Sequence, residues 1–237
     1  MRAKIGLVLL PVMAVLFAGA SAQAVIMGFV DNPTGNSVDW TNYVTGLGAV
    51  VNDNVDFEAH PLGPLQNDFY LVSDGVSFIP GGAIGNVMYG AGPGQANDTT
   101  PPTSNGEGVH PPSNYLQAGQ GHSSLVISFD APNYGAGLFI IDHFNPYGTN
   151  PIVIEAWDGP DATGNLLGSF SSVAYNFQRN KMYFMGIASS EGDIRSVRLD
   201  IAGELSDVVG LDDIRFAVPE PGALALLALG GLLLRRR

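Results

Sequence analysis

The sequence contains no cysteine, so no disulfide holds any part of the chain together. Positive charge is also scarce, with ten Lys and Arg against 22 Asp and Glu. All of the acidic residues lie between Asp31 and Glu220, and only five basic residues lie there, which gives this interval a formal charge of −17. A surface of this sign repels nucleic acid, which excludes nucleic-acid binding, and it attracts divalent cations and basic partners.

Long helical patterns are also lacking, because no run of about 12 or more residues with helical periodicity occurs between the two ends of the chain. Short apolar or alternating runs are present instead, and turns rich in Gly, Pro, Asn and Asp separate them. This spacing is typical of a β-sandwich or jelly roll. The predicted fold class is therefore all-β, with one antiparallel, jelly-roll-like β-sandwich over residues 25–217 and a hydrophobic helix at each end of the chain.

The clearest strand signals are Ser124–Phe129 and Val197–Ile201, where apolar and polar residues alternate, so that each strand has one buried face. Gly137–Ile141 and Ile152–Trp157 are apolar nearly throughout and are expected to be central strands. Residues 90–113 are mostly Gly, Pro, Asn, Thr and Ser, and we expect a long flexible surface loop there. Further strands are expected at Val55–Glu58, Gly75–Phe78, Tyr115–Ala118, Leu166–Ser171, Lys181–Ile187 and Gly210–Phe216.

The N-terminal segment has the features of a secretory signal peptide. Arg2 and Lys4 precede an apolar run, and a stretch of small residues ends at Ala24. A basic start, an apolar centre and an A-x-A site predict a signal peptide over residues 1–24, cut after Ala24 or, alternatively, after Ala22. The chain is therefore expected to leave the cytoplasm through the Sec machinery.

The C-terminal segment joins two prolines, an apolar run and three arginines. Residues 222–234 form a helix of about 20 Å if fully helical, against a bilayer core of about 30 Å, so the span is short. The basic residues at both chain ends favour a topology with both tails in the cytoplasm and the middle exported. An ordinary C-terminal membrane anchor is the alternative.

The order of these features carries a resemblance. Pro219, Glu220 and Pro221, then the apolar segment, then Arg235–Arg237 resemble the PEP-CTERM sorting signal of exosortase-processed bacterial proteins, here over residues 218–237. The resemblance implies that a membrane exosortase acts at Pro-Glu-Pro and that Arg235, Arg236 and Arg237 form the cytoplasmic basic tail. It implies a precursor tethered to the inner membrane, then a place at the cell surface or in the extracellular matrix, often beside exopolysaccharide in biofilm.

A second resemblance concerns the middle of the chain. Val55–Glu58, Asp74–Phe78 and Val209–Phe216 are similar to a pattern in PEP-CTERM ectodomains with jelly-roll folds like those of carbohydrate-binding modules. In several such modules a structural calcium ion lies where the first strand meets the last. The resemblance therefore implies a jelly-roll ectodomain with a calcium site in that position.

Acidic residues occur at both of these strands. Calcium prefers oxygen ligands, and Glu58, Asp212 and Asp213 are the natural donors. If Ile214 and Phe216 face the core, Asp212 faces it too unless the strand bends, and a buried carboxylate needs a partner such as a metal. The alternative is a group of solvated acids. Asp158–Asn165 also resembles a calcium loop, but it lacks the closing Glu of an EF-hand and is better interpreted as a hairpin turn.

No catalytic residue is assigned. His122, Ser123, Asp142 and His143 offer the residue types of a hydrolytic triad, but no G-x-S-x-G motif accompanies them. The zinc spacings H-x-x-x-H and H-E-x-x-H are also missing. His60, directly before Pro61, and His110, in the long loop, are not expected to be held rigidly.

Exposed aromatic rings are the remaining candidates for a binding site, because they stack on the apolar faces of sugar rings. Tyr147, between Pro146 and Gly148, and Trp157 are the ones we select, although core packing is the alternative for Trp157. The leading hypothesis is a non-enzymatic surface or matrix protein that binds exopolysaccharide, with calcium bridging its acidic face to acidic polymer. A secreted hydrolase of glycans or esters with the same tail is the alternative.

Overall fold

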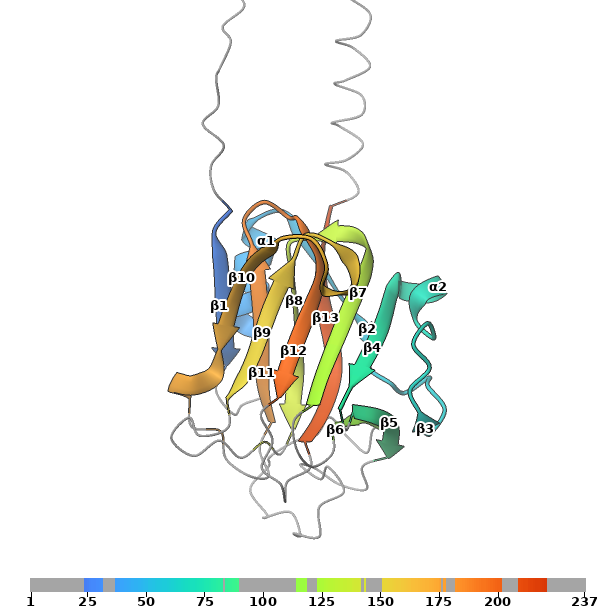
Figure 1. Ribbon diagram of the computed structural model, residues 1–237. Helices are drawn as coiled ribbons and strands as arrows, with labels where there is room; N and C mark the ends of the chain where they lie inside the picture. The colour runs from blue at the N-terminus through green and yellow to red at the C-terminus, as the bar shows by residue number, and fades with distance from the viewer. Residues whose placement is uncertain are drawn as a thin grey trace, which may run out of the picture.

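The computed structural model describes residues 24–31, 37–82, 84–89, 114–118, 123–141, 143, 151–175, 177, 182–201 and 209–220. The expected signal peptide up to residue 23, the loop at residues 90–113 and the tail after residue 220 lie outside these ranges. The described residues form two antiparallel sheets that pack face to face, with short helical segments on the outside (Figure 1). The predicted β-sandwich is confirmed.

The larger sheet has eight strands within the described residues. Its path runs β1-β11-β8-β13-β6-β5-β3, and β2 pairs with β13 beside that path. The bounds are β1 (Ile26–Asp31), β2 (Ala49–Val55), β3 (Gly63–Pro64), β5 (Ile84–Tyr89), β6 (Asn114–Ala118), β8 (Gly135–Ile141), β11 (Met182–Ser189) and β13 (Val209–Pro219).

The smaller sheet has five strands in the order β10-β9-β12-β7-β4. These are β4 (Val76–Gly81), β7 (Ser123–Asn133), β9 (Ile152–Trp157), β10 (Leu166–Ser171) and β12 (Ile194–Ile201). The helical segments are α1 (Val38–Gly46), α2 (Leu71–Asp74), η2 (Pro160–Ala162) and η3 (Ser172–Ala174). Among the described residues, no helix combines the length and the apolar character needed to cross a bilayer.

The main core lies between the two sheets and follows the predicted alternation. On β7, Leu125, Ile127 and Phe129 are buried, and on β12 Val197 and Leu199 are buried. They meet side chains of β8 and β13 from the facing sheet in one cluster. Because successive side chains of a strand point to opposite faces, the residues between them point outward. The sandwich is therefore built largely by alternation that can be read in the sequence.

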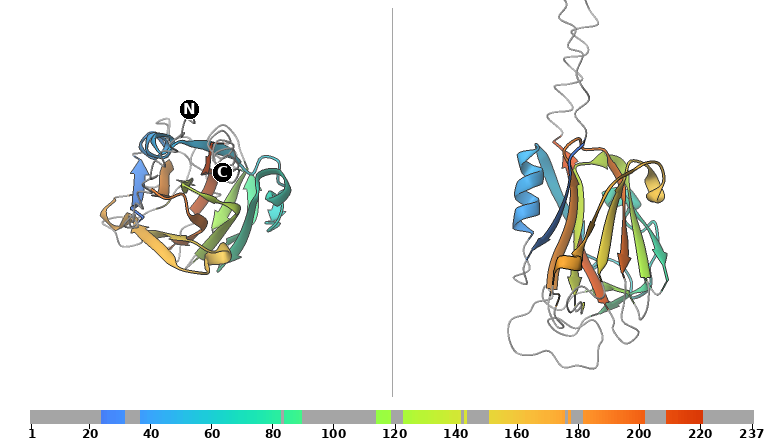
Figure 2. Two further views of the ribbon diagram at one scale, coloured as in Figure 1. Left: turned by 90° about the horizontal axis from the view of Figure 1, so that it is seen from above. Right: turned by 60° about the vertical axis from the view of Figure 1, so that its left-hand side comes forward.

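A second core lies outside the larger sheet, under α1. Trp40 of α1 is fully buried and packs against Phe184 at 5.5 Å between ring centroids. Its indole N–H donates to the Ile187 carbonyl at 3.3 Å. A Cβ atom on Gly137 would lie 2.3 Å from the Phe184 ring, so this position has to be glycine. Figure 2 shows α1 covering this outer face, which explains why β8 is buried on both faces.

Strand β9 was expected to be buried on both faces, but only one of its faces is buried. Ile152, Ile154 and Ala156 are buried, but the residues between them are only half-buried. The strand lies inside the sheet between β10 and β12, as expected of a central strand. No described helix covers its outer face as α1 covers β8, so that side remains accessible to solvent.

The strand predicted at Val55–Glu58 is wrong in its position. Strand β2 comes before it and ends at Val55, which pairs with Ile214 of β13. Phe57 follows with a φ of 60°, a left-handed conformation that few residues other than glycine adopt, and its ring is fully buried. The chain turns here because the Phe57 ring enters the core and the backbone can no longer continue the ladder.

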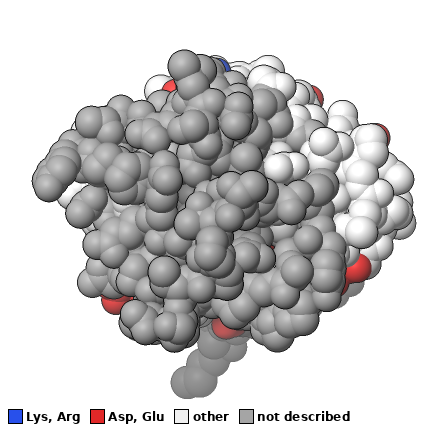
Figure 3. Space-filling model, turned by 90° about the horizontal axis from the view of Figure 1, so that it is seen from below, with Lys and Arg blue, Asp and Glu red and all other residues white. Residues whose placement is uncertain are grey.

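Strand β13 holds the larger sheet together. It pairs with β8 on one side, and on the other side with β6 at its start and β2 towards its end. The start of β1 and the end of β13 lie at the same end of the sandwich (Figure 1). The opposite end is seen in Figure 3, where the described surface carries scattered acidic groups.

Candidate functional site

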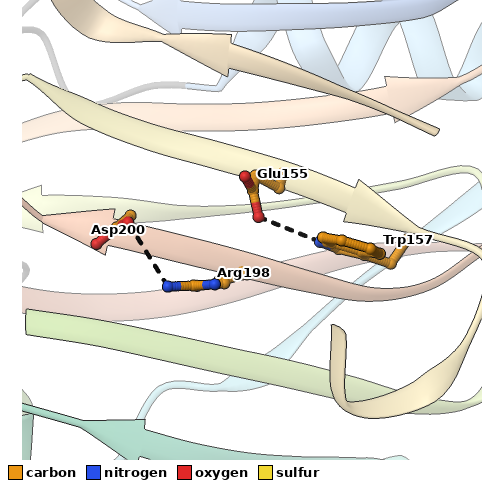
Figure 4. A network of polar contacts seen from close by, with 4 residues as sticks. All are labelled: Glu155, Trp157, Arg198 and Asp200. Atoms are coloured by element: carbon orange, nitrogen blue, oxygen red, sulfur yellow. Dashed lines mark hydrogen bonds and ion pairs between the residues drawn. The ribbon is translucent and has the colours of Figure 1, made fainter. Parts of the chain in front are cut away.

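The outer face of the five-stranded sheet presents polar and aromatic side chains together. Glu155 and Trp157 lie two residues apart on β9 and point to this face, as do Arg198 and Asp200 on β12 (Figure 4). In the register of the sheet, Glu155 lies opposite Arg198, and Arg198 lies opposite Val126 of β7. We call these outward side chains of β9 and β12 the Trp157 face.

Trp157 is the aromatic group of this face. Its indole Nε1 donates a hydrogen bond of 3.3 Å to Oε2 of Glu155. The side chain is half-buried, whereas Trp40 is fully buried in the second core. The alternative interpretation of Trp157 as a core residue is therefore wrong. The hydrogen bond fixes the orientation of an accessible ring.

Arg198 and Asp200 form an ion pair beside the ring. Nη2 of Arg198 lies 3.7 Å from Oδ2 of Asp200, and the two side chains are 40% and 31% exposed. An exposed pair of this kind adds at most about 1 kcal/mol to the stability of the fold. The Arg198 guanidinium therefore keeps donors available to a ligand, whereas Oδ1 of Asp200 is buried.

The connection between β9 and β10 forms a wall at one side of the Trp157 face. Asp161 has a φ of 57° and is held by Ser128, whose hydroxyl accepts from the Asp161 backbone N–H at 2.9 Å. The Ser196 hydroxyl accepts from the Ala162 backbone N–H at 3.0 Å, and Ser196 lies opposite Trp157 in the sheet. Two serines of the sheet thus fix the turn directly beside the tryptophan.

The segment Asp158–Asn165 forms this connection between β9 and β10. Oδ1 of Asp158 accepts from the Asn165 backbone N–H at 2.7 Å, and Oδ2 accepts from the Asn165 amide at 2.8 Å. These bonds lower the pKa of the Asp158 carboxyl below its ordinary value of 3.8, the side-chain bond first. The two strands that flank the segment pair antiparallel, so the interpretation as a hairpin turn is confirmed.

Of the expected calcium ligands, Glu58 lies in the turn that follows β2, and Asp212 and Asp213 lie on β13. Pairing of Val55 with Ile214 places the turn that holds Glu58 near the bend at Asp212 and Asp213. Oε1 of Glu58 accepts from the Asn114 backbone N–H at 2.8 Å, and Oδ1 of Asp212 accepts from the Asp213 backbone N–H at 2.8 Å. In the part of the chain that is described, no group of three or more His, Asp or Glu is arranged to hold a metal.

The side chain of Asp212 is only 2% exposed, but the residue lies opposite Phe139 of the second core, so it faces the outer side of the larger sheet. The orientation towards the core between the sheets, expected for a strand without a bend, is therefore wrong. Ile214 and Phe216 are also buried, and the strand bends between them and Asp212. Asp213 takes a φ of 44° at this bend, a left-handed conformation rare for residues other than glycine. The pairing of β13 with β8 shifts register there, which puts Asp212 and Ile214 on opposite faces of the strand.

Tyr70 is a residue of this region that the sequence pattern did not indicate. It is 3% exposed, and its hydroxyl is buried without a hydrogen-bond partner among the described residues. Burial raises the pKa of Tyr70, and the negative charge of Asp56 raises it further. The ring packs against Phe57 and Phe78, so its hydroxyl lies in an apolar surrounding with carboxylates nearby. Nothing in the local sequence signals this arrangement.

The histidines differ from expectation in one case. His60 is 2% exposed, and its Nε2 accepts from the Gln66 backbone N–H at 3.0 Å. Its Nδ1 therefore donates to the Pro61 carbonyl, 2.7 Å away. The expectation that His60 is not held rigidly is wrong, because both ring nitrogens fasten the loop. His143 is buried edge-on against Phe177, whereas His110, His122, Asp142 and Tyr147 lie outside the described residues.

The sorting tail begins inside the fold. Pro219 is the last residue of β13 and lies opposite Ala49 of β2. The backbone N–H of Glu220 then donates to the Gly48 carbonyl at 3.3 Å. Pro221, Arg235, Arg236 and Arg237 lie outside the described residues.

Residues 217–237 match the family model of the PEP-CTERM protein-sorting motif. The chain thus carries the tail of exported proteins that are anchored in the membrane as precursors and processed by an exosortase. The match covers only this tail, and it assigns no activity to the sandwich. Comparison with curated proteins gives no significant match.

Among solved structures, the chain is similar to the K3 cleaved adhesin domain of Lys-gingipain from Porphyromonas gingivalis, with a TM-score of 0.41 and 17% identity, over 70% of this chain and 98% of that one. TmCBM61 in complex with β-1,4-galactotriose has a TM-score of 0.38 and 12% identity, over 67% and 99%. The family 11 carbohydrate-binding module from Clostridium thermocellum has a TM-score of 0.32 and 11% identity, over 68% and 98%. With TM-scores below 0.5, none of these likenesses assigns a ligand to this chain.

The turn beside Trp157 generates a prediction about pH. Because the folded-state pKa of Asp158 is lowered, its carboxylate stabilises the fold above its ordinary pKa of 3.8, and this contribution is lost as the pH falls through the lowered value. Replacing Asn165 with Ala removes the side-chain bond, so the pKa of Asp158 should rise towards 3.8. Titration of the side-chain carboxyl by NMR measures this. An Asp158 carboxyl that titrates identically in the parent and in Asn165→Ala would contradict the assignment.

Proposed function

We propose that this chain is a non-enzymatic protein of the cell surface or extracellular matrix whose sandwich binds polysaccharide through the Trp157 face. The exported precursor is tethered to the inner membrane by residues 218–237 until an exosortase cuts at or near Pro219, Glu220 and Pro221. The match of residues 217–237 to the sorting motif supports the export and processing. The geometry around Trp157 supports the binding.

The observation that carries the binding proposal is a half-buried indole held by a carboxylate on the outer face of the smaller sheet, beside the turn at η2. The apolar face of a sugar ring stacks on an aromatic ring, and its hydroxyls need donors and acceptors at the rim. Glu155 and Asp200 accept hydrogen bonds from hydroxyls, whereas Arg198 donates them. The three groups lie on the same side of the sheet as the ring (Figure 4). This combination suits a neutral or weakly charged glycan lying across β9 and β12.

The contacts of the two carboxylates on this face favour binding over hydrolysis. Trp157 keeps Glu155 in a hydrogen bond, and Arg198 keeps Asp200 in an ion pair. Each carboxylate is therefore already oriented by a cationic or N–H partner on the same face, as suits a group that accepts hydrogen bonds from a ligand. We therefore favour binding over the alternative of a secreted hydrolase.

Calcium is the second part of the proposal. A cation near the junction of β2 and β13 would take oxygens from Glu58, Asp212 and Asp213, and the strong negative charge of the ectodomain favours it. The buried Tyr70 hydroxyl, which has no hydrogen-bond partner among the described residues, supports a polar ligand at this place. A calcium ion there would tie the turn at Phe57 to the last strand. Calcium at the protein surface would also bridge its acidic groups to an acidic polymer.

Binding at the Trp157 face can be measured by the intrinsic fluorescence of the full exported domain. Trp40 is fully buried, so a change on titration with neutral and acidic exopolysaccharides reports Trp157. Trp157→Ala should weaken binding at least tenfold, which corresponds to about 1.4 kcal/mol. Tyr43→Ala is the matched control, because this partly buried aromatic residue lies on α1, outside the other sheet.

Equal affinity of Trp157→Ala and the parent, both measured by affinity electrophoresis, would contradict the binding proposal. Release of reducing ends or free acid from the same panel of glycans and esters, lost on substitution of Glu155 or His143, would favour the hydrolase instead.

Calcium is tested by thermal unfolding with calcium and with a chelator. A cation bound only by the folded state raises the melting temperature of the parent. Asp212→Asn should abolish that increase. Tyr70→Phe should reduce the increase but leave the melting temperature in chelator unchanged or slightly higher, since it removes a buried hydroxyl without a partner. The same melting temperature for the parent under both conditions would contradict a calcium site.

A further inference from the structure

The sorting motif starts before the fold has ended, and this overlap restricts how a processing enzyme can reach it. Val218 and Pro219 are the last residues of β13 and lie opposite Val50 and Ala49 of β2. The side chain of Val218 packs against the main core. The first proline of Pro-Glu-Pro is thus a strand residue of the sandwich.

Pairing continues into the acidic residue of the motif, since the Glu220 N–H donates to Gly48. In an antiparallel ladder, hydrogen-bonded and non-hydrogen-bonded residue pairs alternate. Glu220 with Gly48 is a hydrogen-bonded pair, so Val218 with Val50 is another, and Pro219 with Ala49 falls between them. Pro219 therefore occupies a position where its missing N–H costs no bond to β2, which is where a strand tolerates proline.

Little chain remains between this ladder and the apolar segment. The apolar run starts at Gly222, so only Glu220 and Pro221 separate it from the last residue of β13. Two residues span at most about 7 Å when fully extended. With the domain folded and the apolar segment in the membrane, Pro219 and Glu220 would lie within a few residues of the lipid surface, with one side occupied by β2.

We propose that the end of the β2–β13 ladder gates processing: residues 218–220 must separate from residues 48–50 before the exosortase can cut, and this local opening sets the cutting rate. The proposal rests on the proposed function, because it concerns the regulation of the same cleavage. The ends of strands open locally at much lower cost than whole domains, so the opening needs no global unfolding. The folded ectodomain thereby sets the rate of its own release.

The test locks the ladder with a disulfide. The chain has no native cysteine, so Val50→Cys with Val218→Cys introduces one defined pair. Partners in a hydrogen-bonded antiparallel pair have Cα atoms about 5.5 Å apart, within the range that a disulfide accepts. The matched control is Val153→Cys with Ser171→Cys, a cross-strand pair of β9 and β10 in the other sheet.

Full-length parent and variants are expressed in a host with its exosortase and in a strain lacking it, and loss of the tail is followed by pulse-chase and mass spectrometry. The locked variant should lose its tail at least about tenfold more slowly than the parent. Addition of a reductant should restore the parent rate, and the control disulfide should leave it unchanged. Val50→Gly, which weakens the same end of the ladder, should speed processing at least about twofold.

The outcomes separate the two proposals. A parent that keeps its tail equally in both strains contradicts the proposed exosortase processing, and the gate with it. If the parent is processed only in the strain with the exosortase, but the oxidised variant with Val50→Cys and Val218→Cys is processed as fast as the parent, the gate alone is contradicted. If the disulfide does not form, the unchanged rate of a folded Val50→Gly variant overturns the gate, and a faster rate supports it.

Discussion

Backbone pairing along β13 is the constraint on which the rest of this structure depends. This last strand joins β8 to β6 and β2, so it connects the β1-β11-β8 part of the larger sheet to the part formed by β2, β3, β5 and β6. Without cysteine, the chain has no covalent link that could replace this pairing. Its buried side chains, among them Leu211 and Ile214, complete the core between the two sheets. The strand that completes the larger sheet therefore also contains the start of the sorting motif.

The environments of the two tryptophans differ between the outer faces of the two sheets. The outer face of the larger sheet is closed by α1, and Trp40 fills the space between them with its N–H bonded to a backbone carbonyl. The outer face of the smaller sheet is covered only in part, by η2, and beside it the half-buried Trp157 is bonded to a carboxylate instead. The first arrangement stabilises the fold, whereas the second leaves an aromatic ring available to a ligand. The sandwich thus has a structural face and a face suited to binding.

Much of the fold could be predicted from the sequence, because alternation and turn residues are local signals. The bounds of β9 and β10 were predicted to the residue, and those of β7, β8, β11 and β12 to within a few residues. Strands β1 and β5 and helix α1 were not predicted. Their sequences show neither a regular alternation nor a long helical run, and their stability comes from pairing with β11 and β6 and from packing of Trp40, which are contacts between distant parts of the chain.

The candidate site was harder to predict for the same reason. Trp157 could be selected, but whether it lies inside or outside depends on which sheet faces are covered, and only the fold decides that. Glu155, Arg198 and Asp200 gave no signal, because their meeting depends on the register between β9 and β12. His60 and Tyr70 were also missed, since their burial follows from the left-handed turn at Phe57. The sorting tail was predicted in full because its signal is linear.

The most direct measurement of the central claim is amide hydrogen exchange along β13 in the full-length precursor. The account predicts that Leu211 exchanges only with global unfolding, and that Glu220, bonded to Gly48, exchanges faster but remains protected relative to an unpaired peptide. Exchange of Glu220 at the rate of an unpaired peptide would contradict the account, because the fold would then end before the sorting motif begins.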